Sequence, residues 1–322
     1  MIKTSGNNLL KYTGEAMLLL MTLIWGGTFV IVKESLNDIS SMLFLFLRFV
    51  IAGSIIAIYL VFKRYRIDKK AILPGVILGS ILFLSFVFQT IGLKYTSATK
   101  SAFLTGTFIV FVPLLQIVIE RKIPTRGATI GTLLVLAGIL FLSSSGNSFG
   151  NILNEIGGNF NIGDGLTIMC ALLFAFQVIY MDIYSPKFDF WSLFITQLIT
   201  VALLSLILGI FFDFINLEPL TINLTENLWI GILYTSILAT CLCFGLQTKF
   251  QKTVTPTKAS IIYSFEPIFA ALFAFFLLSE KISNFGLVGS ALIFLGLIIS
   301  EVFDTFWERI NSQRIANGNS EG

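Results

Sequence analysis

Two ionisable side chains, Arg48 and Glu266, stand inside long apolar runs of the sequence, where a charge is costly. Such groups usually face a cavity or one another. We predict that Arg48 binds a substrate carboxylate and that Glu266 binds a proton or an amine. Two alternatives stay open: the two groups form a structural ion pair, or Arg48 satisfies helix carbonyls.

Two prolines mark positions where helices are expected to bend. Pro267 follows Glu266 directly, and Pro113 lies in another apolar run. A proline removes one helical hydrogen bond and frees the carbonyl one turn earlier, here at Tyr263 and Ile109. A freed carbonyl beside a carboxylate suits a coupling ion or a substrate, so Glu266, Pro267 and Pro113 are the predicted coupling and gating residues. The alternative is that both prolines only shape the bundle.

The other candidates for substrate binding are polar or amphipathic side chains within apolar runs. Amides are expensive in lipid unless they are hydrogen-bonded, and aromatic rings with a polar tip suit an amphiphilic ligand. For the two repeated glutamines, the alternative is a structural hydrogen bond between helices. We assign the phenylalanines mostly to packing and lipid contact. Besides Arg48 and Glu266, the predicted binding residues are Trp25, Thr28, Gln89, Thr105, Gln177, Tyr180, Gln247 and Tyr263.

The sequence lacks the residues that several kinds of chemistry need. The chain has no histidine, so it lacks the commonest general base and metal ligand. Its three cysteines lie in apolar runs, where buried thiols are expected. We therefore predict that the protein is not an enzyme and has no catalytic residues, no metal site, no cofactor and no nucleic-acid partner. A membrane-embedded transferase is a distant alternative, and a non-transporting scaffold is another.

The composition places these side chains in a membrane. Of 322 residues, 56% are hydrophobic and only 12% are charged, with a mean hydropathy of +0.89. A soluble domain carries roughly twice that charged fraction, so lipid must cover this surface. We predict an all-α integral membrane protein with ten transmembrane helices, since a span needs about 20 apolar residues. The ten runs are 15–33, 41–62, 72–93, 99–119, 126–143, 164–184, 190–212, 227–248, 257–279 and 284–304.

Lysine and arginine orient the predicted bundle. The loop 63–70 carries five of them, and residues 121–126 carry three. The longer loops expected on the opposite side, 144–163 and 213–226, carry none. Because cytoplasmic loops are enriched in basic residues, we predict a multi-pass protein of the plasma (inner) membrane with both termini in the cytoplasm.

One stretch of the sequence occurs twice. Residues 86–103 read FVFQTIGLKYTSATKSAF, and residues 244–261 read FGLQTKFQKTVTPTKASI. Six residues recur at a spacing of 158 (244 − 86), and the spacing persists in two later glycine pairs. More weakly, GEAMLLL near the start and GDGLTIM after residue 162 both open with glycine and an acid. The matched pairs are Phe86/Phe244, Gln89/Gln247, Thr90/Thr248, Lys94/Lys252, Thr99/Thr257, Lys100/Lys258, Gly131/Gly289 and Gly138/Gly296.

The duplication predicts a specific architecture. Each half has five spans, and an odd number forces the second half to enter the membrane with the opposite orientation. We therefore expect a 5+5 inverted-topology repeat around a central cavity, with the substrate near the midplane. The predicted parts are a first repeat (1–145), an extracytoplasmic linker (146–163), a second repeat (164–304) and a cytoplasmic tail (305–322).

The repeat also bears on the prolines and on two lysines. The counterpart of Pro267 is Ile109 and not Pro113, so the two kinks are expected to be offset by a turn. Lys100 and Lys258 stand in the first turns of equivalent helices. We expect both to extend to the lipid headgroups; the alternative is that they attract anionic substrates at the two mouths.

Four segments resemble the EamA-type members of the drug/metabolite transporter superfamily. They are LIWGGTFV, LRFVIAG, TSATKSAFLTGTFIVFVPLL and ASIIYSFEPIFAALFAFFLLSE, in that order along the chain. The resemblance implies ten helices around a central cavity, alternating access, and export or exchange of a small metabolite, often an amino acid or a toxic compound. The chain departs from its own repeat after the fourth span, where ERKIP stands in place of LSEKI.

The resulting prediction is a secondary transporter for a small organic solute, working as an exporter and driven by protons. The runner-up is an exchanger of phosphorylated sugars or nucleotide-sugars. That function would need several basic residues near the midplane, and the sequence offers only Arg48. The sequence leaves the oligomeric state open, and a monomer fits it.

Overall fold

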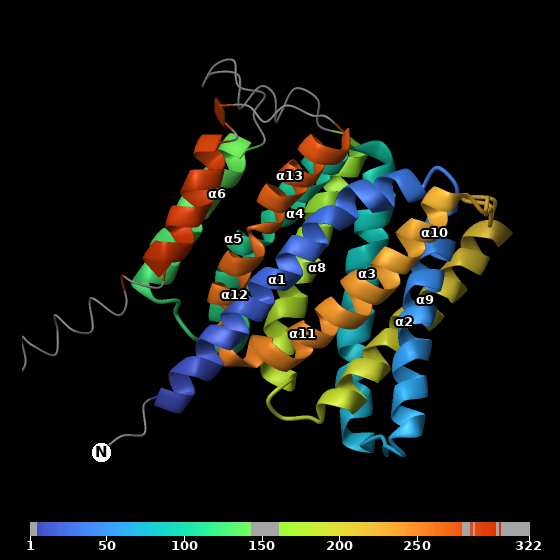
Figure 1. The fold of residues 1–322 in the computed structure, drawn as a ribbon, viewed down its shortest axis with the longest axis horizontal. Helices are drawn as coiled ribbons and strands as arrows, with labels where there is room; N and C mark the ends of the chain where they lie inside the picture. The colour runs from blue at the N-terminus through green and yellow to red at the C-terminus, as the bar shows by residue number, and fades with distance from the viewer. Residues whose placement is uncertain (1–4, 143–160, 279–283, 286, 301–302, 304–322) are drawn as a thin grey trace, which may run out of the picture.

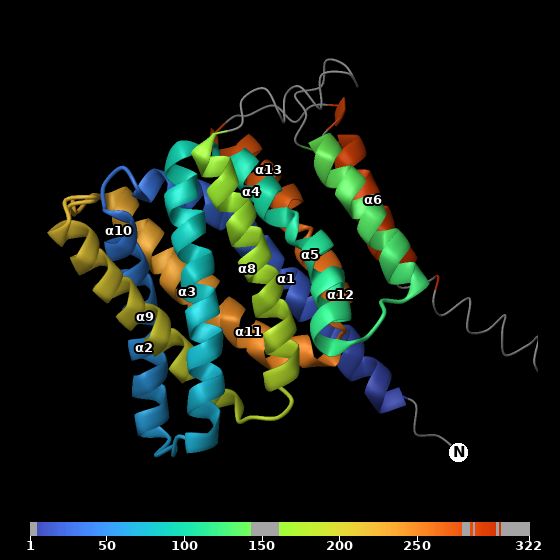
Figure 2. The same cartoon turned by 180° about the vertical axis from the view of Figure 1, so that it is seen from behind.

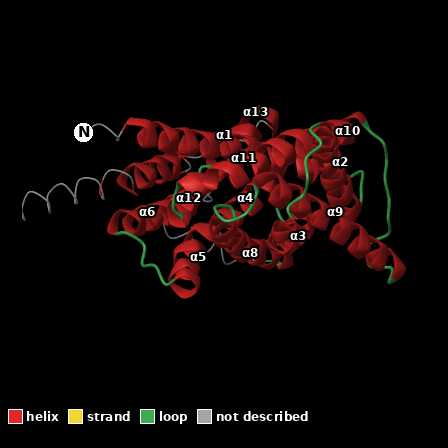
Figure 3. Ribbon diagram, turned by 90° about the horizontal axis from the view of Figure 1, so that it is seen from below, coloured by secondary structure: helices red, strands yellow, loops and turns green. Residues whose placement is uncertain are grey.

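The computed structural model describes residues 5–142, 161–278, 284–285, 287–300 and 303. These residues form helices and loops, with one isolated bridge between Ile39 and Ile222 (Figure 3). The expected all-α architecture is therefore confirmed over the described residues. The predicted tail and all but the last three residues of the predicted linker lie outside them.

By length and composition, eight helical stretches of the described chain can cross a membrane. The predicted fifth and tenth spans correspond to shorter apolar helices, Arg126–Phe141 and Leu287–Ser300. The chain is thus a multi-pass membrane protein, while the count of ten spans stays a prediction. The eight stretches are Thr13–Ser35, Ser41–Phe62, Lys69–Tyr95, Ala98–Glu120, Ile162–Tyr184, Phe190–Phe214, Glu226–Thr253 and Pro256–Leu277.

Five long helices are continuous, and four of them pack together. Helix α3 packs against α8 and α9, and α2 packs against α9, as Figures 1 and 2 show from opposite sides. The first turn of α1 and the loop between α2 and α3 lie at the same end of the molecule (Figure 1). The five helices are α1 (Ser5–Ser35), α2 (Ser41–Phe62), α3 (Ile72–Tyr95), α8 (Ile162–Tyr184) and α9 (Phe190–Phe214), and a short 3₁₀ turn, Lys69–Ala71, precedes α3.

The fourth and ninth predicted spans are each broken near the middle. The fourth comprises α4 (Ala98–Gly106), α5 (Phe108–Leu115) and a π-helical segment (Gln116–Glu120), with the break at Thr107. The ninth comprises α12 (Pro256–Tyr263) and α13 (Glu266–Leu278), with a turn at Ser264–Phe265. Thr107 and Phe265 are 158 residues apart, so the two breaks are equivalent in the repeat.

The expectation of offset kinks is therefore wrong. Pro113 lies inside α5, and the chain breaks six residues earlier. The Thr107 hydroxyl donates to the carbonyl of Leu104 at 2.6 Å, which offers the backbone an alternative to the helical pattern. A Cβ added to Gly106 would lie 3.0 Å from Cγ of Pro267. The break in one span thus packs against the break in the other, with α4 beside α13 and α5 beside α12.

The helical stretch Glu226–Thr253, predicted as the eighth span at 227–248, also departs from a regular α-helix. Between α10 (Glu226–Leu233) and α11 (Cys243–Phe250) lies a π-helical segment, Tyr234–Leu242, and a 3₁₀ turn, Gln251–Thr253, follows α11. The Tyr234 hydroxyl donates to the carbonyl of Ile24 at 2.8 Å, so tertiary contacts support the segment. Short π-helical turns frequently occur at functional sites.

Glycines allow α6 (Arg126–Leu142) to touch the helix of residues 287–300 at one edge of the molecule (Figure 1). A Cβ added to Gly131 would lie 2.7 Å from the carbonyl oxygen of Gly296, and one added to Gly296 would lie 2.8 Å from that of Gly131. A Cβ on Gly138 would lie 2.6 Å from the carbonyl oxygen of Gly289. The two backbones are in direct contact, a packing that small residues permit in membranes.

This contact predicts that the protein loses stability when Gly131 or Gly138, the two α6 glycines that take part in it, gains a methyl group. Gly131→Ala and Gly138→Ala force the two backbones apart, at a cost of about 1–3 kcal/mol. Gly53→Ala is the matched control, because the nearest atom to its new Cβ is 3.9 Å away. In thermal unfolding of the detergent-solubilised protein, the first two variants should melt at lower temperature and the control should not. Equal melting temperatures for all three variants would contradict the close contact.

Candidate substrate-binding site

One cavity gathers most of the side chains that the sequence singles out. The space between its lining atoms, with the open approach included, is about 540 Å³. Nine of the ten predicted binding residues line it: Trp25, Thr28, Arg48, Gln89, Thr105, Gln177, Gln247, Tyr263 and Glu266. Whether they bind a substrate stays a prediction.

The tenth predicted residue, Tyr180, lies outside the cavity. Its ring packs against Tyr184, with 5.7 Å between centroids, beside a small cluster around Leu78, Met181 and Leu193. Tyr180 is in the same helix as Gln177, but it turns towards this cluster. Being polar-tipped and aromatic within a span was therefore not enough to identify a lining residue.

Five further residues line the cavity that sequence reasoning did not select: Phe86, Phe108, Phe174, Val178 and Phe244. The expected packing role holds for these four rings, which belong to the hydrophobic core or pack against it, but the same rings also border the cavity. The repeat held a usable signal for two of them. Phe86 and Phe244 are counterparts, and each stands three residues before a cavity glutamine, which places ring and amide on one helix face.

Arg48 lies on α2 with 3% of its surface exposed, and it borders the cavity. Its Nε donates to Oγ1 of Thr240 at 2.8 Å, the one hydrogen bond of this side chain within the described chain. The guanidinium carbon stands 4.5 Å from the centroid of the Phe86 ring and 5.4 Å from that of Phe49, so ring faces help to hold the charge. The terminal nitrogens therefore remain for a ligand.

Glu266 begins α13 directly after the helix break and also borders the cavity. The positive end of the α13 dipole favours a carboxylate at this position. Among the described residues, no ion pair joins Glu266 to Arg48 or to any other cation. The alternative of a structural Arg48–Glu266 pair is thus not what the molecule adopts.

The aromatic wall is fixed by hydrogen bonds from several helices. Trp25 donates through Nε1 to the carbonyl of Ala239, in the π-helical segment, at 3.0 Å. Its ring lies 5.2 Å from that of Phe244 and 5.9 Å from that of Tyr263. The Tyr263 hydroxyl in turn donates to Oε1 of Gln251 at 3.1 Å. These contacts fix the orientation of both rings.

Two amide oxygens at the cavity lack partners. Oε1 of Gln177 and Oε1 of Gln247 are buried and accept no hydrogen bond within the described chain, although the Gln247 amide nitrogen donates to Gln251 at 3.1 Å. Gln89 does have a hydrogen bond, because its amide nitrogen donates to the Thr105 hydroxyl at 3.5 Å. A buried acceptor without a donor is costly, so these oxygens are ready to receive donors from a bound molecule.

The cavity therefore offers one cation, one anion, free hydrogen-bond acceptors and a wall of aromatic faces. A set of groups of this kind can bind and orient a solute of mixed polarity. In the described residues, no group of three or more His, Cys, Asp or Glu side chains is placed to hold a metal ion.

Comparison with known proteins gives several matches over most of the chain. An "Uncharacterized transporter" of Archaeoglobus fulgidus is 32% identical over 88% of this chain and 83% of its own length. YoaV of Bacillus subtilis, also an uncharacterized transporter, is 23% identical over 87% and 94%. The "S-adenosylmethionine/S-adenosylhomocysteine transporter" of Chlamydia muridarum is 25% identical over 82% and 84%.

A solved structure described only as "Crystal structure of protein" superimposes with a TM-score of 0.72 at 15% identity, over 90% of this chain and 98% of that one, which shows the fold alone. The model of the EamA-like transporter family matches residues 12–144 and again residues 161–301. These matches are to transporters and not to enzymes, and together they cover nearly the whole sequence. The chain belongs to the EamA-like transporter family, within the drug/metabolite transporter superfamily.

Proposed function

We propose that this transporter exports a small zwitterionic solute with a flat apolar part, by alternating access and with proton coupling at Glu266. The observation that carries the proposal is a single cavity in which Arg48 and Glu266 both take part without pairing with each other. A carboxylate on the solute would meet the guanidinium, and an amine would meet Glu266. The aromatic faces would cover the apolar part.

The substrate class has support from one group of relatives. The Chlamydia muridarum transporter and two from Chlamydia trachomatis, each about 25% identical, are named for S-adenosylmethionine and S-adenosylhomocysteine. Both compounds join an amino-acid zwitterion to a flat nucleoside. The cavity's ion-binding groups and ring faces suit that combination. Phosphorylated sugars and nucleotide-sugars suit it less, because Arg48 is the one basic residue lining the cavity.

Alternating access rests on the proposed 5+5 inverted repeat of ten spans, with halves at 1–145 and 164–304. The glycine contacts support it: Gly131 meets Gly296, the counterpart of Gly138, and Gly138 meets Gly289, the counterpart of Gly131. Reciprocal contacts of this kind are typical of a two-fold relation between equivalent surfaces. The equivalent helix breaks, which cross beside the cavity, support it independently.

Removing either charge of the cavity should reduce transport. In proteoliposomes, Arg48→Gln and Glu266→Gln should each lower the rate for the best zwitterionic solute by roughly 10–100-fold, the value of a lost charge-assisted hydrogen bond. Glu266→Gln should also abolish stimulation by a pH gradient. Tyr180→Phe is the control and should transport normally, since it lies outside the cavity. Normal flux in both charge variants would contradict the assignment.

The proposed orientation places both termini and the loop 63–70 in the cytoplasm of a plasma-membrane protein. Single cysteines test it in a chain whose three native cysteines are serine. Arg66→Cys, in that loop, should react with an impermeant thiol reagent only after cells are opened. Leu224→Cys, whose residue is 64% exposed in the α9–α10 loop, should react on intact cells. The reverse pattern would overturn the orientation.

A further inference from the structure

Two lysine–carboxylate pairs stand at equivalent positions in the two halves of the chain. Lys100 Nζ lies 2.6 Å from Oδ2 of Asp164, and Lys258 Nζ lies 2.8 Å from Oε1 of Glu15. The expectation that both lysines extend to lipid headgroups is therefore wrong. Each pair joins the two halves: Lys100 is in the first half and Asp164 in the second, and the other pair has the reverse arrangement.

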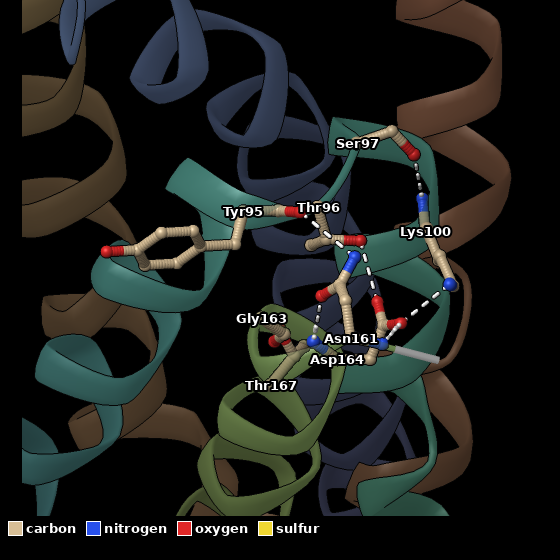
Figure 4. A network of polar contacts seen from close by, with 8 residues as sticks. All are labelled: Tyr95, Thr96, Ser97, Lys100, Asn161, Gly163, Asp164 and Thr167. Carbon is tan, nitrogen blue, oxygen red and sulfur yellow. Dashed lines mark hydrogen bonds and ion pairs between the residues drawn. The ribbon is translucent and has the colours of Figure 1, made fainter. Parts of the chain in front are cut away.

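The Asp164 pair is part of a dense polar network at one end of the molecule (Figure 4). The Asp164 side chain is fully buried. It accepts from the Thr96 hydroxyl at 2.8 Å and from the backbone N–H of Asn161 at 2.9 Å. Asn161 returns the bond by accepting from the Asp164 N–H at 3.1 Å, which forms a capping box at the start of α8.

The surroundings of the Glu15 pair repeat part of this arrangement. A Cβ on Gly163, beside Asp164, would meet the Gly92 carbonyl at 2.6 Å and Tyr95 Cβ at 2.8 Å. A Cβ on Gly14, beside Glu15, would meet the Phe250 carbonyl oxygen at 3.7 Å and also the Thr253 side chain; Phe250 and Thr253 are the counterparts of Gly92 and Tyr95. The helix N-caps are also equivalent: Ser97 accepts from Lys100 N–H, and Thr255 accepts from Lys258 N–H.

Each of the two ion pairs lies on its own side of the cavity. Thr105 lines the cavity five residues after Lys100, and its counterpart Tyr263 lines it five residues after Lys258. Five helical residues span roughly 7.5 Å along the axis, and the two helices enter from opposite ends. Each ion pair therefore ties together the helices at one end of the cavity, between that cavity and one membrane face.

We propose that the Lys100–Asp164 and Lys258–Glu15 pairs are the two gates of the carrier, each broken when the cavity opens to its own side. This inference rests on the proposed alternating access. Both pairs are made in the present structure.

The two gates are not equally strong. Asp164 accepts hydrogen bonds from Lys100, Thr96 and the Asn161 backbone, whereas Lys258 is the one partner found for Glu15 among the described residues. The counterpart of Thr96 is Val254, which has no hydroxyl to offer. The carrier without solute therefore opens more readily at the Glu15 end, the end where the loop 63–70 also lies.

Thiol labelling from the two sides tests the gates without any knowledge of the substrate. The reporter is Val178→Cys, at the cavity wall, in a chain whose native cysteines are serine. Glu15→Gln should raise its labelling rate roughly tenfold from the side on which Arg66 lies, and Asp164→Asn should raise it from the opposite side. Thr96→Val, which copies Val254, should act weakly in the same direction as Asp164→Asn. Val254→Thr should slow labelling from the Arg66 side.

Controls separate gating from damage to the fold. Glu15→Lys combined with Lys258→Glu restores the pair with reversed charges and should restore the original rates. Lys94→Gln removes the Lys94–Glu218 ion pair at the Asp164 end, outside the α4–α8 contact, and should change neither rate. Unchanged labelling in all gate variants, or faster labelling from both sides in each, would overturn the proposal. Side-specific labelling together with failed zwitterion flux would instead refute only the substrate class.

Discussion

A peptide group that loses its helical partner inside a bilayer finds no water to replace it. Several departures from the α-helix in the described chain are stabilised by hydrogen bonds from side chains. The break at Thr107 is bonded by its own hydroxyl, and the turn at Ser264 is bonded by the serine side chain to Ser260 at 2.8 Å. In the π-helical segment Tyr234–Leu242, the carbonyl of Ala239 accepts a hydrogen bond from Trp25 and so holds the tryptophan ring in place. The cavity exists because these irregular segments meet around it.

The same constraint explains how Arg48 can be buried without an anion. Its charge rests on the Thr240 hydroxyl and on the faces of Phe86 and Phe49, which attract a cation less strongly than a carboxylate does. A permanent partner such as Glu266 would neutralise the site before a solute arrived. Under the proposed function, keeping the two charges apart would leave both available to a solute, and it would make an empty cavity less favourable than a filled one.

Much of the site was predictable because polar groups in apolar runs are few, and nine of the ten selected residues line one cavity. The failures have a common physical cause. Whether Phe174 or Tyr180 faces the cavity depends on how α8 is rotated about its own axis, and the sequence does not contain that rotation. The break at Thr107 and the partners of Lys100 depend on Pro267 and Asp164, which come from the other half of the chain. Reasoning from one helix at a time therefore predicted a kink at Pro113 and predicted that Lys100 extends to the lipid headgroups.

The reciprocal glycine contact between α6 and residues 287–300 has an evolutionary consequence. Under the proposed 5+5 repeat, each partner offers the surface that its own counterpart needs, so one five-helix unit would carry a patch that fits a copy of itself. Two separate polypeptides inserted in opposite directions could have associated through this patch before any fusion of their genes. Joining them in one chain would then have fixed a one-to-one stoichiometry and freed each half to diverge, as Thr96 and Val254 have done.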